Sequence, residues 1–338
     1  MSLVSIVLPT FNRAAFLPHA VASIRSQTLQ DWHLIVVDDG STDNTADVLR
    51  RLAADLGTRV TIVRQDNRGA YAARNTGLDH VASRFVALFD SDDVWLPEYL
   101  ATCVAALEAN ADVDWVYAAC RIVDLASGAT VSPDTFVLDG APRPFRRLRS
   151  HARKALNIID DPDTVSVALR HGLYCGLQNS VIRNSVFVAQ RFHTPYRNEA
   201  EDQLFVIRAL KHGFRFGYIN SVLVQYHVHD ANSSAAAVGQ TAERQRTLLE
   251  LLIRGFEDLR TDVALTREEN RVLAQRLLKE YFWHLGYAVL LKSGNLSAAK
   301  SAFRRGLREW PWSLRCWKTY AIAEARSWMN RESGGSVA

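Results

Sequence analysis

The sequence has few cysteines and no long apolar segment. Its four cysteines, Cys103, Cys120, Cys175 and Cys316, form no CxxC pair and stand near no histidine at zinc-site spacing. We therefore expect reduced thiols in the core of a cytosolic protein, rather than disulfides or a zinc site. No run of about 18 apolar residues and no signal peptide is present, so we predict no membrane-spanning helix.

Glycine-rich phosphate-binding loops are also absent. The first apolar run ends in Pro9-Thr10-Phe11-Asn12 rather than in GxGxxG, and GxxxxGK[ST] occurs nowhere in the chain. This excludes the common dinucleotide-binding fingerprint and the P-loop. If the protein binds phosphates, a metal ion held by carboxylates has to do the work of such a loop.

The composition is that of a globular protein. The chain has 338 residues, of which 48% are hydrophobic and 22% charged. One large or two modest domains with a sizeable core are expected. The net charge is only +4, but basic residues and tryptophans gather near the C-terminus. This asymmetry predicts an acidic partner, either lipid headgroups or a phosphorylated acceptor. Nucleic acid is not expected, because no recognised nucleic-acid-binding motif accompanies the charge.

Apolar strands alternate with amphipathic helices in the first part of the chain. This alternation predicts an α/β fold with a doubly wound, mainly parallel sheet flanked by helices. Ligands in such sheets bind at the carboxyl ends of the strands. The predicted strands lie at 4–8, 34–37, 60–63, 85–89 and 113–120, and the predicted helices near 17–24, 45–52, 72–81 and 97–109.

An acidic cluster, Asp90-Ser91-Asp92-Asp93, directly follows the apolar run Phe85–Phe89. Three carboxylates so close together would repel one another. A divalent cation that bridges them to a phosphate oxygen would remove this repulsion. The alternative is a solvated acidic turn before a helix that begins near Pro97.

Polar residues follow two further predicted strands. A structural explanation accounts for any one such cluster as a turn, but it explains poorly why all of them fall at strand carboxyl ends. The clusters are Thr10-Asn12-Arg13 and Asp38-Asp39, beside the acidic cluster.

Several segments together resemble the inverting glycosyltransferases of family 2, which have the GT-A fold. Each segment is weak alone, but the set follows the family's order and spacing. The segments are Val7-Leu8-Pro9-Thr10-Phe11-Asn12-Arg13, Val36-Val37-Asp38-Asp39-Gly40-Ser41-Thr42-Asp43, Asn67-Arg68-Gly69, Ala73-Arg74-Asn75-Thr76-Gly77 and Asp90-Ser91-Asp92-Asp93.

The resemblance implies a donor-binding site for a nucleotide-diphosphate sugar. Thr10 and Asp39 would hold the nucleoside, and Asp39 would accept a hydrogen bond from a base N–H. Asp90 and Asp92 match the family's DxD pair, which touches the ribose and an Mn²⁺ or Mg²⁺ ion, and Asp93 is a competing metal ligand. The other implied donor-binding residues are Pro9, Asn12, Arg13, Asn67, Gly69, Arg74 and Ser91. Arg13 and Arg74 would lie close to the nucleoside pocket; the structural alternative for Arg74 is a salt bridge on a helix surface.

The segment Asn198–Phe205 resembles the family's Glu-Asp motif. An inverting transfer is a one-step displacement at the anomeric carbon, so one carboxylate must take the proton of the acceptor hydroxyl. Asp202 is the first candidate for this general base and Glu201 the second. The structural alternative is an acidic first turn that complements a helix dipole, and both explanations can hold together.

The segment Tyr226-His227-Val228-His229 resembles the family's Tyr-Arg-x-His segment. His229 would reach the diphosphate or the metal, although a lone histidine is usually structural. His227 stands in the usual place of an arginine, so Arg183 or the basic run 143–154 could neutralise the leaving group instead. Residues 172–182 resemble the stretch that lines the acceptor pocket. The QxxRW motif of processive members is absent, which favours transfer of one sugar per encounter.

We expect two regions. Residues 1–235 would form the catalytic domain, with a nucleotide-sugar half (about 1–120) and an acceptor half (about 121–235). The irregular stretch 122–173 would be an insertion or flexible loop over the site. Residues 236–338 would be α-helical and contain one tetratricopeptide-like hairpin, which packs on the catalytic domain or on a second subunit of a homodimer. The hairpin pattern is Trp283, Ala299, Phe303 and Pro311. The basic, Trp-rich end suits an anionic membrane surface or amphipathic packing equally.

These features predict a metal-dependent, inverting, non-processive glycosyltransferase. It would move one sugar from a nucleotide-diphosphate donor, first of all a UDP-sugar, to a saccharide or lipid-linked acceptor in bacterial surface glycan synthesis. We expect it in the cytoplasm, at the inner face of the membrane. One alternative is a sugar-nucleotide pyrophosphorylase, which would need a glycine-rich, lysine-bearing loop after the first strand. The other is a catalytically weak scaffold, against which Asp39, Asp92 and Asp202 argue.

Overall fold

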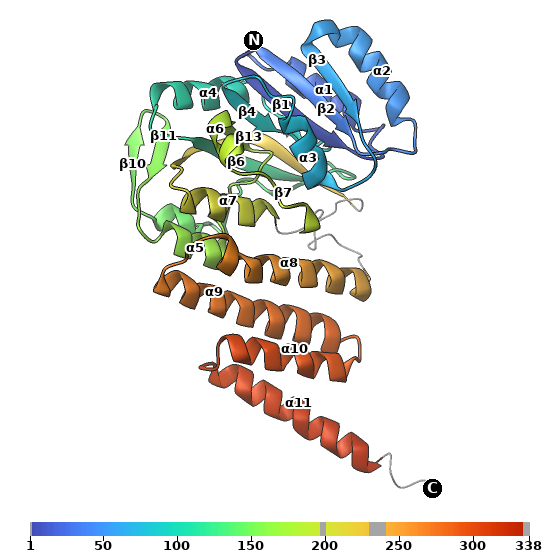
Figure 1. The fold of residues 1–338 in the computed structure, drawn as a ribbon, viewed down its shortest axis with the longest axis vertical. Helices are drawn as coiled ribbons and strands as arrows, with labels where there is room; N and C mark the ends of the chain where they lie inside the picture. Colours follow the sequence, from blue (N-terminus) through green and yellow to red (C-terminus); the bar gives the residue numbers. More distant parts are fainter. Residues whose placement is uncertain (1, 197–200, 230–240, 334–338) are drawn as a thin grey trace. The chain divides into compact units, whose positions relative to one another are not determined.

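The computed structural model describes residues 2–196, 201–229 and 241–333, with side chains up to residue 325. The chain forms two compact units, residues 1–232 and 233–338 (Figure 1). The first unit holds the sheet, and the second is helical.

The first half of the sheet is the predicted parallel alternation. Its strands lie in the order β4-β1-β2-β3, and every neighbouring pair is parallel. All residues of β1 and β4 are buried, as expected of parallel strands covered on both faces. These elements are β1 (Val4–Thr10), α1 (Leu17–Arg25), β2 (Trp32–Asp38), α2 (Thr45–Leu56), β3 (Val60–Arg64), α3 (Ala70–Leu78) and β4 (Phe85–Leu88).

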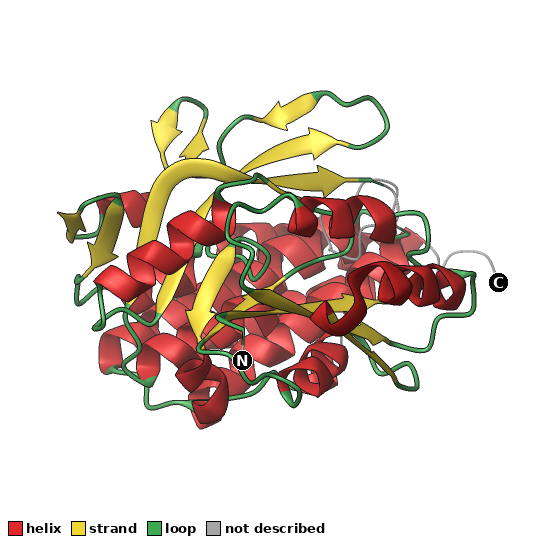
Figure 2. Cartoon of the chain, turned by 90° about the horizontal axis from the view of Figure 1, so that it is seen from above, coloured by secondary structure: helices red, strands yellow, loops and turns green. Residues whose placement is uncertain are grey.

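The second half of the sheet is mixed. Strand β12 (Ser180–Arg183) is antiparallel to both of its neighbours, β4 and β6 (Trp115–Asp124). Strand β6 therefore runs in the direction of β4, and it pairs in parallel with β13 (Phe216–Val228). The central sheet is thus mainly parallel, as predicted; Figure 2 shows its strands in yellow and the flanking helices in red. The remaining elements of this half are β5 (Val94–Trp95), α4 (Tyr99–Ala109), α6 (Asn184–Ala189) and α7 (Glu201–Lys211).

The expectation of a flexible loop over residues 122–173 is wrong. Phe136 and Phe145 in this stretch are fully buried, with ring centroids 5.0 Å apart, and Phe145 lies 5.4 Å from Tyr218 of β13. The stretch instead consists of short elements around these buried rings. The elements are β7 (Thr130–Ser132), β8 (Val137–Leu138), β9 (Ala141–Pro142), η2 (Pro144–Arg147), β10 (Ser150–Arg153), β11 (Leu156–Ile159) and α5 (Thr164–His171).

Helix α3 lies unusually close to the sheet. A Cβ atom added to Gly77 would come within 2.4 Å of the Val7 Cγ1 atom of β1. Because no real side chain tolerates such an approach, glycine is needed here for the helix to rest on the strand. Arg74 and Asn75 lie three and two residues before Gly77 on this helix.

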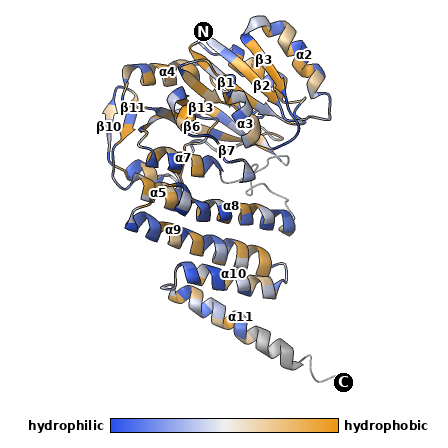
Figure 3. Ribbon diagram, in the orientation of Figure 1, coloured by the Kyte–Doolittle hydropathy of each residue, from blue (hydrophilic) through white to orange (hydrophobic). Residues whose placement is uncertain are grey.

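The second unit consists of consecutive helices. Helix α9 begins with a capping box, in which the Thr266 side chain and the Glu269 backbone and carboxylate bond reciprocally. The π-helical segment η4 packs on α10 through Phe282 and Phe303, whose centroids are 4.3 Å apart. Figure 3 shows hydrophobic and hydrophilic stripes along these helices. They are α8 (Ala242–Asp262), α9 (Arg267–Lys279), η4 (Glu280–Leu291), α10 (Leu296–Glu309) and α11 (Leu314–Ser333). In the described ranges, none of the helices has the length and hydropathy that a bilayer span requires.

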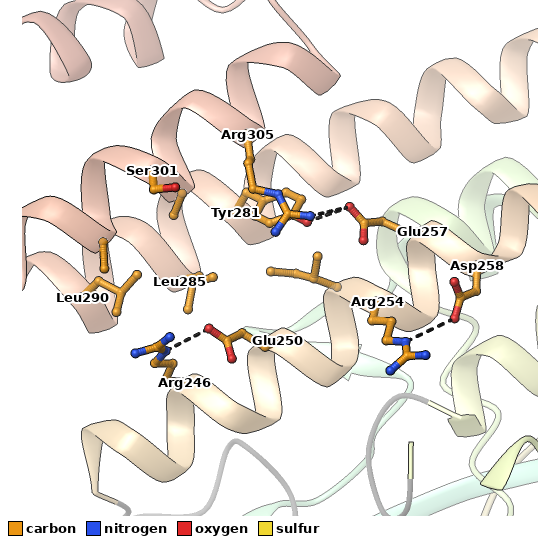
Figure 4. Close-up of a pocket in the computed structure, with 13 residues that line it drawn as sticks. Arg246, Glu250, Arg254, Glu257, Asp258, Tyr281, Leu285, Leu290, Ser301 and Arg305 are labelled. Atoms are coloured by element: carbon orange, nitrogen blue, oxygen red, sulfur yellow. Dashed lines mark hydrogen bonds and ion pairs between the residues drawn. The ribbon is translucent and has the colours of Figure 1, made fainter. Parts of the chain in front are cut away.

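A pocket of about 670 Å³ lies between α8, η4 and α10 (Figure 4). Its lining includes the apolar side chains of Ile253, Leu285, Leu290, Ala298 and Ala302. Three arginines and three carboxylates of the lining pair with one another, so their charges balance. The pairs are Arg246 with Glu250 (2.8 Å), Arg254 with Asp258 (3.8 Å) and Arg305 with Glu257 (3.5 Å).

Candidate functional site

The predicted polar clusters meet at one edge of the sheet. Strands β1, β2 and β4 are parallel neighbours, so the residues that follow them emerge on the same side. The backbone N–H of Asp39 donates to the carbonyl oxygen of Thr10 at 2.8 Å, which joins the first two clusters directly. The Thr10 hydroxyl is buried and has no hydrogen-bond partner among the described residues. It is therefore suited to bond a ligand.

The Asp39 carboxylate organises the loop before α3. It accepts hydrogen bonds from the side-chain amide of Gln65 (2.7 Å) and from the backbone N–H groups of Arg68 (2.9 Å) and Gly69 (2.8 Å). Asp39 is only 3% exposed. Since a carboxylate has about four lone-pair positions, these three bonds leave room for one further donor. Asp39 therefore stabilises the loop before α3. Its hydrogen bond to a base N–H remains a prediction.

Asn12 joins two loops at the same edge. Its backbone has φ 52°, and its side-chain oxygen accepts from the backbone N–H groups of Thr42 (2.8 Å) and Asp43 (3.3 Å). The Asn12 N–H donates to the Ser41 hydroxyl at 2.9 Å. These bonds hold the loop after β1 against the loop after β2. Asn12 therefore has a structural role at this edge of the sheet.

Asp92 and His229 lie side by side. The Nε2 atom of His229 is 3.1 Å from Oδ2 of Asp92, and the Nη2 atom of Arg13 is 3.5 Å from the same oxygen. The His229 ring stacks on Phe16 at 5.1 Å, which fixes its orientation. Arg13 therefore forms an ion pair with the acidic cluster. At this place its positive charge could also contact a diphosphate.

Asp93 points into the protein. It is almost completely buried, its Oδ1 accepts the backbone N–H of His227 at 3.1 Å, and its Oδ2 has no hydrogen-bond partner in the described residues. Burial raises the pKa of this carboxyl well above its usual range, and the nearby charges of Asp92 and Asp90 raise it further. The His227 ring lies 2.7 Å from the Asp92 carbonyl oxygen. These contacts favour Asp92 over Asp93 as the side chain that faces a ligand.

Two side chains at this edge are candidates to hold a metal ion. No group of three or more His, Cys, Asp or Glu side chains is arranged to hold a metal within the described ranges. Asp92 and His229 supply one carboxylate and one imidazole. Such a pair fits an Mn²⁺ or Mg²⁺ ion whose other ligands are diphosphate oxygens and water.

Arg74 joins the acidic cluster to helix α7. Its Nη2 atom lies 2.6 Å from Oδ1 of Asp90, and its Nη1 atom lies 3.7 Å from Oδ1 of Asp202. The arginine is 5% exposed, so the explanation as a surface salt bridge is wrong. Desolvation raises the pKa of Asp202, the nearby Arg74 charge lowers it, and Asp90 raises it again. Asp202 nevertheless keeps 43% of its side-chain surface accessible.

Glu201, the second candidate base, has a structural position. It is fully buried, forms an ion pair with the buried Arg208, and accepts the backbone N–H of His193 at 2.7 Å. Desolvation raises its pKa to about 7, against the opposing effect of Arg208. Because its oxygens are enclosed by these partners, Asp202 is the better placed of the two carboxylates to meet an acceptor.

Arg183 does not face the acidic cluster. Its guanidinium donates to the carbonyl oxygens of Val113 (2.8 Å), Leu107 (2.6 Å) and Asn110 (3.2 Å), so it fastens β12 to the end of α4. It is therefore not the substitute cation that we expected as one option. In the basic run, Arg149 pairs with Asp160 at 3.1 Å.

One contact of the site was missed by the sequence reasoning. The side chain of Asn75 donates to the carbonyl oxygen of Phe192 (2.9 Å) and accepts the Phe192 N–H (3.0 Å). Asn75 was part of a recognised motif, but nothing in the sequence signals a partner 117 residues away. This pair of bonds ties α3 to the segment that leads to Asp202.

Comparison with known proteins shows which family the chain resembles. The model of Glycosyl transferase family 2 matches residues 5–174. The succinoglycan biosynthesis protein ExoW of Rhizobium meliloti is 32% identical over 217 residues, which are 61% of this chain and 62% of that protein. The putative glycosyltransferase EpsH of Bacillus subtilis is 26% identical over 295 residues, or 86% of this chain and 75% of that protein. The alignment thus spans less than two thirds of ExoW.

Solved structures show the same fold. S. aureus TarS in complex with UDP-GlcNAc superposes with a TM-score of 0.61 at 17% identity, covering 90% of this chain and 81% of that one. The mannosyltransferase PcManGT of Pyrobaculum calidifontis, in complex with GDP-Man and Mn²⁺, gives 0.57 at 18% identity, covering 98% and 84%. The sheet is thus of the GT-A type, as predicted. Since the family model covers half of its length, the chain belongs to glycosyl transferase family 2.

Proposed function

We propose that this protein is an inverting, metal-dependent glycosyltransferase that moves one sugar per encounter from a nucleotide-diphosphate donor to an acceptor hydroxyl. The observation that carries the proposal is the cluster of ionisable side chains at the sheet edge. His229 and Asp92 stand at one end, and Asp90, Arg74 and Asp202 follow. This cluster offers a diphosphate site and a proton acceptor within one constellation.

The nucleoside would lie against β1 and β2. The buried Thr10 hydroxyl and the remaining lone pair of Asp39 are the hydrogen-bonding groups for it. Gly69, with φ 92°, turns the chain into α3, and its backbone is held by Asp39. The TarS neighbour holds a UDP-sugar and the mannosyltransferase a GDP-sugar, so a UDP-sugar is the first donor to test and GDP-mannose the second.

Asp92 and His229 would hold the metal ion, and Arg13 stands beside them. The ion, when bound, supplies positive charge to the diphosphate that leaves. Arg13 adds a second positive charge from the protein. The buried Asp93 accepts a hydrogen bond from the His227 backbone N–H. Asp92, His229, Arg13 and Asp93 would thus form the part of the site that binds the leaving diphosphate.

Asp202 would act at the opposite end as the general base. An oxygen of its carboxylate takes the proton of the acceptor hydroxyl while that hydroxyl oxygen forms a bond to the anomeric carbon. The bond between the anomeric carbon and the diphosphate oxygen breaks, and its electron pair leaves with the diphosphate. Because attack and departure occur on opposite faces, the configuration inverts.

The acceptor would be a saccharide or a lipid-linked saccharide of a bacterial surface glycan. ExoW is named for succinoglycan biosynthesis, and mycobacterial relatives 38% identical over 114 residues are named for PGL/p-HBAD biosynthesis. The sequence lacks the QxxRW motif of processive members. Membership of family 2 counts against the pyrophosphorylase alternative.

Exposed apolar side chains on the helical unit support contact with an anionic membrane at its cytoplasmic face. Trp312 and Leu314 are 77% and 78% exposed, and Trp317 follows one turn later. The exposed Arg308 and Lys318 lie close to them in sequence. Tryptophan beside basic residues is typical of interfacial helices. A homodimer through the same helices is the other proposed use of this surface.

A panel of nucleotide sugars tests the proposal. Thermal unfolding of the full chain should shift upward with the correct donor nucleotide only when Mn²⁺ or Mg²⁺ is present, because a ligand of the folded state stabilises it. That donor should then be hydrolysed or transferred by the wild type and not by Asp202→Asn. If no nucleotide sugar changes the unfolding temperature or is turned over, the result would favour the alternative of a catalytically weak scaffold protein.

A further inference from the structure

Helix α3 carries contacts to three parts of the site on consecutive residues. Arg74 pairs with Asp90 and Asp202, Asn75 bonds the backbone of Phe192, and the Thr76 hydroxyl donates to the side-chain oxygen of Gln65 at 2.6 Å. The amide of that same Gln65 donates to Asp39. One short helix thus touches the nucleoside side, the acidic cluster and the segment before α7.

The Arg74 guanidinium is the centre of these contacts. It is 5% exposed and packs above the Tyr71 ring, with its central carbon 5.4 Å from the ring centroid. Its planar fork contacts one carboxylate with each terminal nitrogen. A lysine would present a single point charge in place of this fork.

We propose that Arg74 is a positioning residue, whose guanidinium holds the Asp202 carboxylate at a fixed place relative to Asp90 and keeps it in the charged form that accepts a proton. This role rests on the proposed function of Asp202 as the base. It differs from the donor contact that the family resemblance implies for Arg74, because Nη2 hydrogen-bonds Asp90 at 2.6 Å and Nη1 forms an ion pair with Asp202 at 3.7 Å. A buried, doubly paired cation is poorly placed to reorganise around a nucleotide.

The surroundings of Asp202 make Arg74 the decisive charge. Arg74 and Tyr71 face it from α3, Asp90 from the end of β4, Glu201 from α7 itself, and Cys175 from the segment before β12. Asp90 and Glu201 are acids, and burial raises the pKa of the Cys175 thiol, so it is uncharged at neutral pH. Of these described neighbours, Arg74 is the cation. Without it, desolvation and two nearby acids would all favour the protonated form of Asp202.

The experiment follows the Asp202 carboxyl directly. Full-length protein labelled with ¹³C at the aspartate carboxyls is titrated by NMR, and the Asp202 signal is identified as the one that Asp202→Asn removes. The variants are Arg74→Gln, Arg74→Lys and the control Arg191→Gln. Arg191 pairs with Asp79 just beyond α3 at 3.3 Å, but both side chains are well exposed. The control therefore removes an arginine–aspartate pair near the same helix without touching the site.

We expect the Asp202 signal to titrate at higher pH in Arg74→Gln than in the wild type, and at the wild-type pH in Arg191→Gln. In Arg74→Lys the charge remains, so the titration should stay close to wild type. Turnover of the donor found in the panel should nevertheless fall by about 10²-fold, because the base is no longer held in place. Donor KM should change little in this variant.

An unchanged titration in Arg74→Gln would overturn the proposal, as would full turnover by Arg74→Lys. If Arg74→Gln does not fold, as judged by circular dichroism, the turnover and KM of Arg74→Lys decide the question. A raised donor KM with unchanged kcat in Arg74→Lys would make Arg74 a donor-binding residue and overturn the positioning role. If the titration moves as expected while the wild type turns over no nucleotide sugar, the coupling stands and the proposed function fails.

Discussion

The Nε2 atom of His229 lies 3.1 Å from the Oδ2 atom of Asp92, although 137 residues separate them in the chain. His229 directly follows β13, and Asp92 follows β4; β5, just after the acidic cluster, pairs with β13. The pairing Val224–Trp95 and Gln225–Val94 brings the two segments together. The late histidine motif therefore belongs to the same edge of the sheet as the early acidic cluster.

We predict that Asp92→Asn and His229→Ala each weaken the binding of Mn²⁺ in the presence of the donor nucleotide and abolish most transfer. Each variant removes one of the two metal ligands that we propose among the described residues, so the ion would be under-coordinated. Mn²⁺ affinity can be measured by electron paramagnetic resonance. Asp47→Asn, on the surface of α2, is the control. Undiminished Mn²⁺-dependent turnover by Asp92→Asn would contradict the assignment.

We predict that Asp39→Ala lowers both donor affinity and stability. A base N–H would lose a charged acceptor, at a cost of about 1.5–3 kcal/mol of binding free energy. The amide of Gln65 and two backbone N–H groups would also lose their partner, so the loop before α3 should loosen. Calorimetry with the donor's nucleoside diphosphate measures the first effect, and thermal unfolding the second. Lower stability with unchanged affinity would leave Asp39 as a loop-holding residue only.

Glu201→Gln should destabilise the fold and leave the chemistry of the folded fraction nearly intact. The substitution replaces one acceptor oxygen by an NH₂ donor, so either the buried Arg208 guanidinium or the His193 backbone N–H loses a hydrogen-bond acceptor, which typically costs about 1–3 kcal/mol of unfolding free energy. Urea unfolding measures the loss, and turnover per folded molecule measures the chemistry. A stable variant that has lost turnover would instead identify Glu201 as the base.

The contribution of Glu201 to stability should depend on pH. Its pKa in the folded protein, about 7, lies above its ordinary value of 4.5, so the folded state binds this proton more tightly than the unfolded state does. The contribution is therefore largest below about pH 4.5 and declines as the pH rises through about 7. The difference in unfolding free energy between wild type and Glu201→Gln, followed from pH 4 to pH 8, gives the sign. A contribution that grows with pH would contradict it.

We predict salt-sensitive binding of the full chain to anionic liposomes. The double variant Trp312→Ser and Leu314→Ser should lose most of this binding, because it removes two exposed apolar anchors. Val131→Ser, which changes an exposed apolar residue of the first unit, is the control. Cosedimentation at low and high salt measures binding. Equal, negligible binding by wild type and double variant would leave oligomer contacts as the proposed use of this surface.

The sequence predicted the parallel half of the sheet well, because each strand there is a short apolar run followed by a turn and an amphipathic helix. Strands β1 to β4 and helices α1 to α4 lie within a few residues of their predicted places. The stretch 122–173 was mistaken for a loop because its strands are only two to four residues long. The long-range contacts of Phe136 and Phe145 that order it leave no periodic pattern in the sequence.

The site residues were found by motif, but several of their partners were not. That Arg74 is buried between Asp90 and Asp202 could not be read from its helical position, since tertiary packing decides which face of α3 is covered. The hydrogen bonds of the Arg183 guanidinium to backbone carbonyl groups could not be predicted either, and nor could the Asn75–Phe192 bonds. In both cases the partner lies far away in the sequence.

The transfer rate of Asp202→Asn, measured together with its donor affinity, decides whether Asp202 is the general base. The asparagine keeps the shape of the side chain but cannot accept the proton, so kcat should fall by about 10²–10⁴-fold. The Kd of the donor should hardly change, because the proposed role of Asp202 is toward the acceptor and the groups proposed to bind the donor remain. A collapse of donor affinity with turnover near that of wild type would contradict the account and make Asp202 a donor-site residue.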